Sequence, residues 1–166
     1  MPASVRVLLV DDYEPFCRVI VSRLQEQPEL LAIAEASDGF EAVQKAKELQ
    51  PDLILLDIGL PKLNGIEAAR QIREVSPTSK ILFVSECRSA DIAEAALNTG
   101  AGGYVVKSDV TGDLSAAVDA VLKGERFLSA SLEGDDHVPL HTAASASEHK
   151  TDEEFCRRFA ESAWIF

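Results

Sequence analysis

One apolar run between two carboxylates, Asp52-Leu-Ile-Leu-Leu-Asp57, constrains the fold of this chain more than any other stretch. Four apolar residues, entered through Pro51-Asp52 and left through a segment rich in glycine and proline, are typical of a strand buried on both faces of a parallel sheet. Asp57 then lies at the carboxyl end of this strand, which is the edge where open α/β sheets bind ligands. Its carboxylate is therefore either a cap for the following loop or a reactive group.

Four more segments have a strand pattern, and a segment with helical spacing of apolar residues follows each of the five strands. Asp38 with Glu41 and Asn64 with Glu67 resemble capping boxes, which predicts the starts of two helices. The predicted strands are 5–10, 30–36, 53–56, 80–85 and 103–107, and the predicted helices are about 14–27, 39–49, 65–75, 90–99 and 109–123. Five successive β-α units predict an α/β fold, namely a flavodoxin-like, doubly wound, five-stranded parallel sheet of order 2-1-3-4-5 with helices on both faces.

The character of the sequence changes after residue 129. The chain has 166 residues, of which 46% are hydrophobic, and this is enough for one domain with a core and an additional tail. All three histidines and an Ala/Ser-rich stretch lie in 129–166. We therefore expect a folded domain at 1–129, a linker at 130–150 and a C-terminal tail at 151–166 that can form one short helix.

The formal net charge of −12 argues against non-specific nucleic-acid binding, because phosphate contacts need clustered lysine and arginine. No apolar run approaches the ~20 residues that a membrane helix needs, and the first residues do not resemble a signal peptide. The three cysteines are few, odd in number and widely spaced, which is typical of a reducing cytosol. We therefore expect a cytoplasmic protein with no membrane partner.

The predicted strand order brings polar side chains together, because its switch point lies between the first and third strands. Asp11, Asp12 and Asp57 should converge there, with Ser85 and Lys107 at neighbouring strand ends. Three gathered carboxylates repel each other by roughly 4 kcal/mol per pair at ~4 Å and an effective dielectric near 20. Structure alone gives no reason to gather them, whereas Mg²⁺ prefers carboxylate, carbonyl and water oxygens.

A magnesium site of this kind can take part in phosphoryl transfer. The three aspartates and Lys107 carry a formal charge of −2, which one Mg²⁺ cancels. The site can then accept a phosphoryl group whose oxygens contact the metal, Lys107 and the Ser85 hydroxyl. Asp57 remains as the nucleophile and would form an aspartyl phosphate. The simpler alternative is that Asp11-Asp12 is only a turn and cap pair.

Over about 5–129, the sequence resembles the receiver domain of two-component response regulators. The resemblance rests on acidic residues after the first and third strands, Ser85 after the fourth and Lys107 after the fifth. It extends to the loops Leu60-Pro-Lys-Leu-Asn-Gly65 and Gly100-Ala-Gly-Gly-Tyr104. The resemblance implies that Asp57 accepts phosphate from a histidine kinase or a phosphotransfer protein, with no enzymatic activity beyond its own phosphorylation and dephosphorylation.

The resemblance also implies a metal set and a switch. Asp12 and Asp57 would bind Mg²⁺ directly together with the Gly59 backbone carbonyl, and Asp11 would act through water. Lys107 would pair with the phosphoryl group. Ser85 and Tyr104 would form the switch: Ser85 moves toward the phosphoryl group, and Tyr104 rotates into the space that this movement vacates. The changed surface could then pair with a second copy or bind a partner.

Three features depart from the family pattern. The sequences of 103–109 and 122–129 are similar to those of the branch of the family that usually carries a helix-turn-helix DNA-binding domain. Too few residues follow Ser129 to build such a domain. We therefore expect no direct DNA binding by this chain. Ser108 stands where many receivers have proline, and Glu86 stands where a small residue is common.

Other functions remain as alternatives. The main one is a constitutive protein-interaction module whose phosphorylation is impaired by Glu86. A flavodoxin is rejected, because Asp11-Asp12-Tyr13-Glu14 would repel the flavin phosphate. A phosphatase with an aspartyl nucleophile usually has a second carboxylate two residues on, where this chain has Gly59. Tyr104 could equally serve packing alone.

Overall fold

The computed structural model describes residues 4–133 of the 166. Six strands form one sheet of order β2-β1-β3-β4-β5-β6, and each neighbouring pair is parallel. The strands are β1 (Val5–Val10), β2 (Leu30–Ala36), β3 (Leu53–Leu56), β4 (Lys80–Ser85), β5 (Gly103–Val106) and β6 (Phe127–Leu128). The flavodoxin-like fold and the predicted order of the first five strands are confirmed. The predicted strand count is one too few, because β6 adds to the edge of β5.

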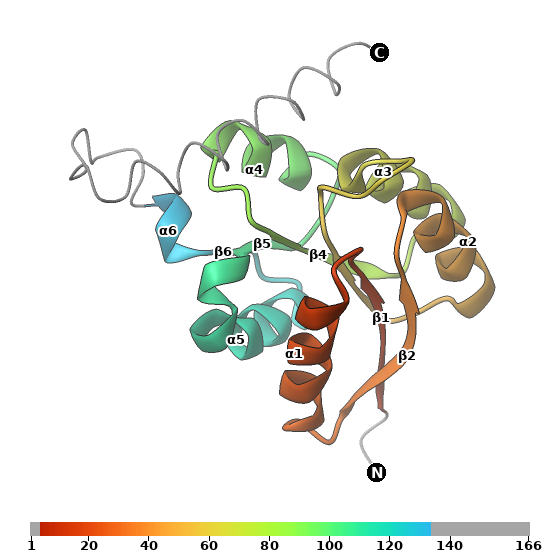
Figure 1. Ribbon diagram of the computed structural model, residues 1–166, viewed down its shortest axis with the longest axis horizontal. Coiled ribbons are helices and arrows are strands. Elements are labelled where there is room, and N and C mark those ends of the chain that lie inside the picture. Colours follow the sequence, from red (N-terminus) through yellow and green to blue (C-terminus); the bar gives the residue numbers. More distant parts are fainter. Residues whose placement is uncertain (1–3, 134–166) are drawn as a thin grey trace.

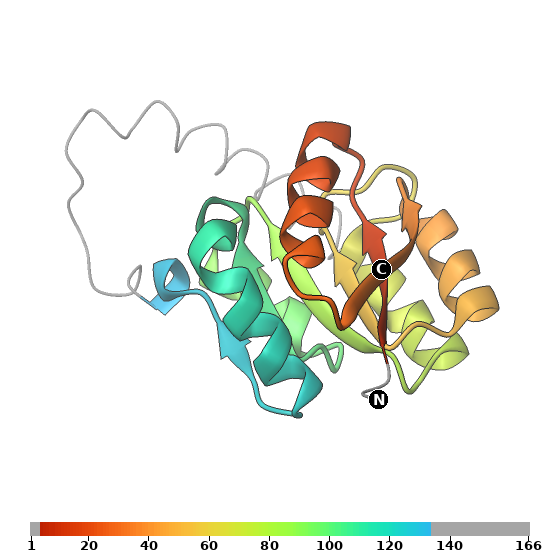
Figure 2. The ribbon, with the colours of Figure 1, turned by 90° about the horizontal axis from the view of Figure 1, so that it is seen from below.

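Helices cover both faces of this sheet (Figure 1). They are α1 (Glu14–Gln25), α2 (Gly39–Leu49), α3 (Gly65–Val75), α4 (Ala90–Leu97), α5 (Val110–Leu122) and α6 (Ala130–Glu133), with a short 3-10 helix, η1 (Lys107–Asp109), before α5. α2, α3 and α4 pack on one face, whereas α1 and α5 pack on the other. Figure 2 looks onto the α1 and α5 side. Within the described residues, no helix has the length and apolar character to cross a bilayer.

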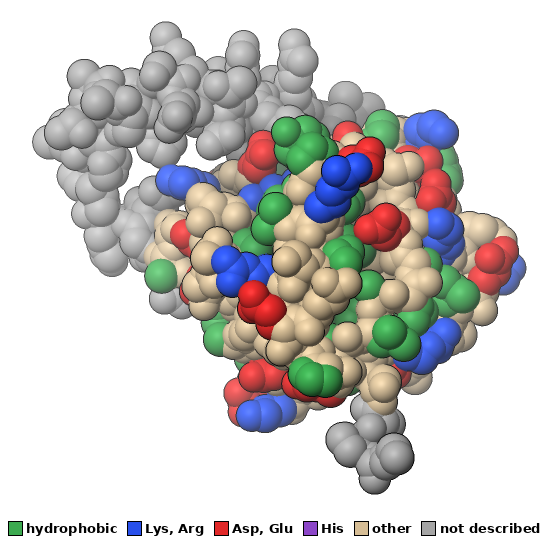
Figure 3. All heavy atoms as spheres, turned by 60° about the horizontal axis from the view of Figure 1, so that its bottom comes forward, with side chains coloured by type: hydrophobic (Ala, Val, Ile, Leu, Met, Phe, Trp, Pro, Cys, Tyr) green, Lys and Arg blue, Asp and Glu red, His purple; other side chains and the backbone are tan. Residues whose placement is uncertain are grey.

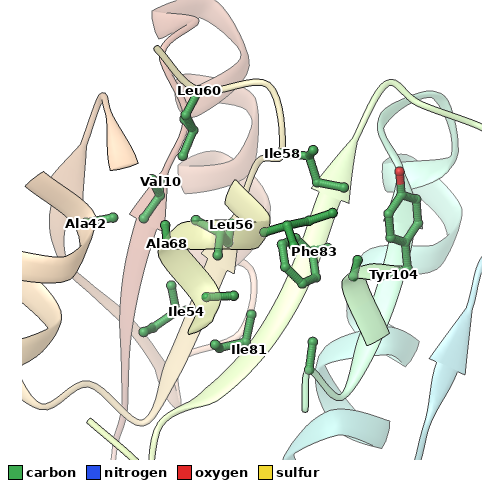
Figure 4. Close-up of a cluster of buried hydrophobic side chains, with 14 of the residues drawn as sticks. Val10, Ala42, Ile54, Leu56, Ile58, Leu60, Ala68, Ile81, Phe83 and Tyr104 are labelled. Atoms are coloured by element: carbon green, nitrogen blue, oxygen red, sulfur yellow. The ribbon is translucent and has the colours of Figure 1, made fainter. Parts of the chain in front are cut away.

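The position of β3 between two layers of helices explains its unbroken apolar sequence. Ile54 and Leu56 belong to the core under α2, α3 and α4, part of which Figure 4 shows. Leu53 and Leu55 belong to the core under α1 and α5. Successive side chains of a strand point to opposite faces, so a strand covered on both sides must be apolar at every position.

The predicted capping residues start their helices as expected. The side chain of Asp38 accepts a hydrogen bond from the Glu41 N–H at 2.8 Å, and that of Asn64 accepts one from the Glu67 N–H at 2.9 Å. These bonds satisfy backbone donors that the first turn of a helix leaves without a partner. They fix where α2 and α3 begin, and therefore how the loops at the carboxyl edge of the sheet leave the strands.

Candidate functional site

Strand pairing brings the three aspartates together at the carboxyl edge of the sheet. Val10 of β1 is in register with Leu56 of β3, and the Asp57 N–H donates to the Val10 carbonyl at 3.0 Å. Asp11 and Asp57 each follow directly on these paired residues. One carboxylate oxygen from each of Asp11, Asp12 and Asp57 can be chosen so that all three lie within 4.8 Å of one another. The predicted convergence of the three carboxylates is confirmed.

Lys107 joins this cluster from the end of β5. Its Nζ lies 2.7 Å from Asp11 Oδ2 and 3.5 Å from Asp57 Oδ2. It also lies 4.5 Å from the centre of the Phe16 ring on α1, at cation–π distance. Lys107 was predicted from the sequence as a site residue, but this role of Phe16 was not, because its helical spacing indicated only packing.

Burial and charge shift the protonation of both partners. Burial raises the pKa of Asp57 to about 7; Lys107 limits the rise, whereas Asp11 and Asp12 add to it. Burial alone would lower the pKa of Lys107, but the charges of Asp57 and Asp11 raise it above its ordinary value. A buried carboxyl whose pKa lies near neutrality can change its charge readily when a cation arrives.

The donor set suits a hard divalent cation. Asp11 and Asp57 are buried whereas Asp12 is exposed, so the cluster is open to solvent on one side. Carboxylate oxygens are the ligands that Mg²⁺ prefers, and the acidic excess of the cluster matches a double positive charge. The backbone N–H of Gly59 favours the ionised Asp57 carboxylate and so lowers its pKa. Metal binding by the Gly59 carbonyl stays a prediction.

Gly65 shapes the loop beside Asp57, which the sequence did not indicate. A Cβ at Gly65 would lie 2.0 Å from the Asp57 carbonyl oxygen and 2.7 Å from the Ile58 Cα, too close for any side chain. The Gly65 N–H donates to the Ile58 carbonyl at 2.8 Å. Glycine therefore allows the start of α3 to pack directly on the backbone that carries Asp57.

Ser85 and Tyr104 form a second group, connected through Cys87. The Cys87 N–H donates to Ser85 Oγ at 3.2 Å, and the Tyr104 hydroxyl donates to the Cys87 carbonyl at 2.7 Å. Ser85 is fully buried at the end of β4, where it is in register with Val106. No hydrogen bond between Ser85 and Asp57 occurs among the described residues.

Tyr104 lies in the interior rather than at the surface. Its exposed fraction is 0%, and its ring centre lies 6.4 Å from that of Phe83 in the core shown in Figure 4. Burial raises the pKa of its hydroxyl well above the ordinary range. We expected Tyr104 to reach a buried position on activation, and this is the position that it occupies in the structure. Its role as a switch stays a prediction.

Comparison with known proteins identifies the family of this domain. Residues 7–119 match the response regulator receiver domain. The chain belongs to this family. It is 34% identical to the transcriptional regulatory protein LiaR of Bacillus subtilis (strain 168) over 148 residues, which are 89% of this chain and 70% of LiaR. It is 36% identical to the nitrate/nitrite response regulator protein NarL of Escherichia coli (strain K12) over 153 residues, or 92% of this chain and 67% of NarL.

A solved structure supports the same assignment. The crystal structure of a two-component response regulator of the LuxR family from Aurantimonas sp. SI85-9A1 matches with a TM-score of 0.75 and 33% identity, over 79% of this chain and 94% of that chain. The resemblance to receiver domains inferred from the sequence is confirmed. The chain spans about two thirds of the length of LiaR and NarL.

Proposed function

We propose that this receiver accepts a phosphoryl group on Asp57 from a histidine kinase or phosphotransfer protein in a Mg²⁺-dependent reaction, and that the modification changes a protein-interaction surface. The observation that carries the proposal is the group formed by three aspartates within 4.8 Å and the Lys107 ammonium 3.5 Å from Asp57. Asp11 and Asp12 would hold the metal together with Asp57. Bound Mg²⁺ supplies positive charge that favours the ionised carboxylates and the incoming phosphoryl oxygens.

The reaction needs few groups from the chain. An Asp57 carboxylate oxygen forms a bond to phosphorus while the bond from phosphorus to the donor's imidazole nitrogen breaks. The electron pair of that bond stays on the nitrogen, which takes up a proton from solvent. Lys107 holds a phosphoryl oxygen and stabilises its charge, a role that its mostly buried position makes effective. Ser85 would approach another phosphoryl oxygen.

We further propose that the output passes through protein contacts, including pairing of two phosphorylated copies, without direct DNA binding by this chain. The net charge of −12 supports this, because DNA contacts need clustered cations. On the face drawn in Figure 3, acidic, basic and hydrophobic side chains are interspersed and no broad basic area appears. The proposed division of the chain at residues 129 and 150 leaves the receiver as the unit that is phosphorylated.

A constitutive interaction module is the second candidate. Glu86 is exposed, follows Ser85 directly, and its charge acts on Lys107. An added acid beside the site would repel the phosphodonor and slow its reaction. In that case the same surfaces would bind partners with no dependence on Asp57.

Intact mass after incubation with acetyl phosphate and Mg²⁺ separates the two functions. The wild type should gain one phosphoryl group, and Asp57→Asn should gain none. Asp52→Asn is the matched control, because Asp52 precedes the same strand, is exposed and lies at the opposite edge of the sheet. If the mass of the wild type stays unchanged while a known receiver reacts in parallel, phosphorylation on Asp57 is excluded and the constitutive module is favoured.

A further inference from the structure

The segment after α5 continues the sheet past the five β-α units. Phe127 and Leu128 of β6 are in parallel register with Gly103 and Tyr104 of β5. The Ser129 N–H then donates to the Tyr104 carbonyl at 3.0 Å. In Figure 2, this blue β6–α6 segment lies beside α5 at the edge of the sheet. It therefore covers the strand that ends at the residue before Lys107.

Ser129 holds the last residue of β5. Its exposed fraction is 0%, and its Oγ accepts a hydrogen bond from the Val106 N–H at 2.9 Å. The same hydroxyl donates to Asp113 Oδ2 at 3.4 Å on α5. A two-residue strand cannot supply an acceptor to every amide of β5, and the side chain of Ser129 supplies the next one. A buried amide without an acceptor would be unfavourable.

Ser131 holds the other end of the turn that carries Lys107. Its hydroxyl donates to Asp109 Oδ2 at 2.5 Å, and Asp109 is the last residue of η1. Leu132, with an exposed fraction of 5%, packs in the same core as Tyr104 and Val106. The turn Lys107–Asp109 is thus fixed at both ends by side chains of one short segment.

We propose that Ser129 and Ser131 are positioning residues for Lys107, so that the segment 127–132 sets the geometry of the phosphorylation site. The inference rests on the proposed function and concerns regulation of the same site. Lys107 must reach Asp11, Asp57 and a phosphoryl oxygen from one backbone position, and displacements near 1 Å are enough to slow reactions that depend on such placement. A partner that displaces this segment would thereby change the reactivity of Asp57.

Phe16 provides a direct readout of where Lys107 lies. Its ring, 4.5 Å from Nζ, should shift the NMR resonances of the Lys107 ε-methylene protons, and Phe16→Leu gives the unshifted reference. In full-length Ser129→Ala and Ser131→Ala we expect this ring-current shift to decrease. The rate of phosphorylation by acetyl phosphate should fall about three- to tenfold, the effect of one lost hydrogen bond. Mg²⁺ affinity, which depends on the aspartates, should change little.

Ser79→Ala is the matched control, because Ser79 is equally buried and donates to the Pro51 carbonyl at the opposite edge of the sheet. Ser79→Ala should keep the ring-current shift of Lys107 and the rate of phosphorylation. All variants are compared at temperatures at which circular dichroism shows that each is folded. Unchanged shifts and rates in both test variants would overturn the inference, as would an equal loss of rate in Ser79→Ala. If Ser129→Ala does not fold, the more exposed Ser131→Ala decides. A wild type that is never phosphorylated defeats the proposed function, while the ring-current shift still decides the positioning of Lys107.

Discussion

The ammonium of Lys107 lies 2.7 Å from Asp11 Oδ2, closer than the 3.5 Å that separates it from Asp57. Asp11 also accepts the Tyr13 N–H through its other oxygen at 2.8 Å, so its carboxylate is held in place from two sides. Lys107 therefore pairs mainly with Asp11, and its ammonium also lies close to Asp57. An incoming phosphoryl group on Asp57 would meet a cation that is already near and needs only a small movement.

Replacement of Lys107 by alanine tests this pairing. Lys107→Ala should slow phosphorylation by acetyl phosphate roughly a hundredfold, because a preorganised charge at the reacting group is lost. Mg²⁺ affinity should stay the same or rise, since the aspartates lose a competing cation. Stopped-flow measurements of the rate and titration with Mg²⁺ check both. Lys62→Ala, which removes an exposed cation paired with Asp38 at 3.5 Å, should leave both quantities unchanged.

The raised pKa of Asp57 predicts how stability depends on pH when metal is removed with EDTA. The pKa rises from 3.8 to about 7 on folding, so the folded state holds this proton more tightly than the unfolded state. Stability should therefore fall as pH rises from 4 to 7 and become level above that, by roughly 4 kcal/mol in total. Lys107 does not interfere, because a raised lysine pKa affects stability only in alkaline solution.

Urea unfolding at several pH values measures this dependence. Asp57→Asn should be more stable than the wild type at pH 8, with a difference that shrinks toward pH 4. Saturating Mg²⁺ should reduce that difference, because the metal favours the ionised carboxylate. If the free energy of unfolding changes with pH in the same way for both proteins in EDTA, Asp57 titrates normally in the folded state.

The sequence was sufficient where the structure depends on local chemistry. Asp38 and Asn64 cap their helices with the residues that the sequence pairs with them. The unbroken apolar run 53–56 indicated a strand covered on both faces, and the strand order then placed Asp11 beside Asp57. These features are specified by residues that lie close together in the chain or by a topology with few alternatives.

The features that were missed depend on contacts between distant parts of the chain. β6 is two residues long, with no periodicity, and exists only because β5 offers an edge. The buried Tyr104 hydroxyl donates to the Cys87 carbonyl, 17 residues away in the sequence. The sequence around Gly65 cannot indicate that a Cβ added at this position would clash with the Asp57 carbonyl. Such details require packing, which sequence periodicity does not encode.

The C-terminal boundary of the receiver is open to a direct test. We expected removal of 130–166 to leave a folded domain, and the described fold continues through α6 to Glu133. A chain ending at 129 should still fold cooperatively but be less stable than one ending at 133, because it loses the burial of Leu132, worth about 1.5–3 kcal/mol. Thermal unfolding of the two chains measures the difference. Equal midpoints would assign α6 no part in the stability of the receiver.

The switch is the remaining prediction, and the structure makes it more specific. If the Ser85 hydroxyl moves toward a phosphoryl group on Asp57, it pulls on the Cys87 N–H, from which it accepts at 3.2 Å. The Cys87 carbonyl holds the Tyr104 hydroxyl at 2.7 Å, so a displaced Cys87 changes the support of the buried ring. A few kcal/mol between two such arrangements is enough to shift their populations. One charge-assisted hydrogen bond from Ser85 contributes about 1.5–3 kcal/mol, so Lys107 and the metal must supply the rest.

Ser85→Ala should therefore still be phosphorylated but should lose most of any phosphate-dependent self-association. Tyr104→Phe should behave in the same way, because it keeps the ring and removes the bond to Cys87. Sedimentation velocity of each variant, with and without beryllofluoride as a phosphoryl mimic, measures the effect. Ser22→Ala, an exposed serine on α1, is the control for a lost hydroxyl and should associate like the wild type. If the wild type associates on activation and both switch variants do so equally well, the path from Asp57 through Ser85, Cys87 and Tyr104 does not carry the signal.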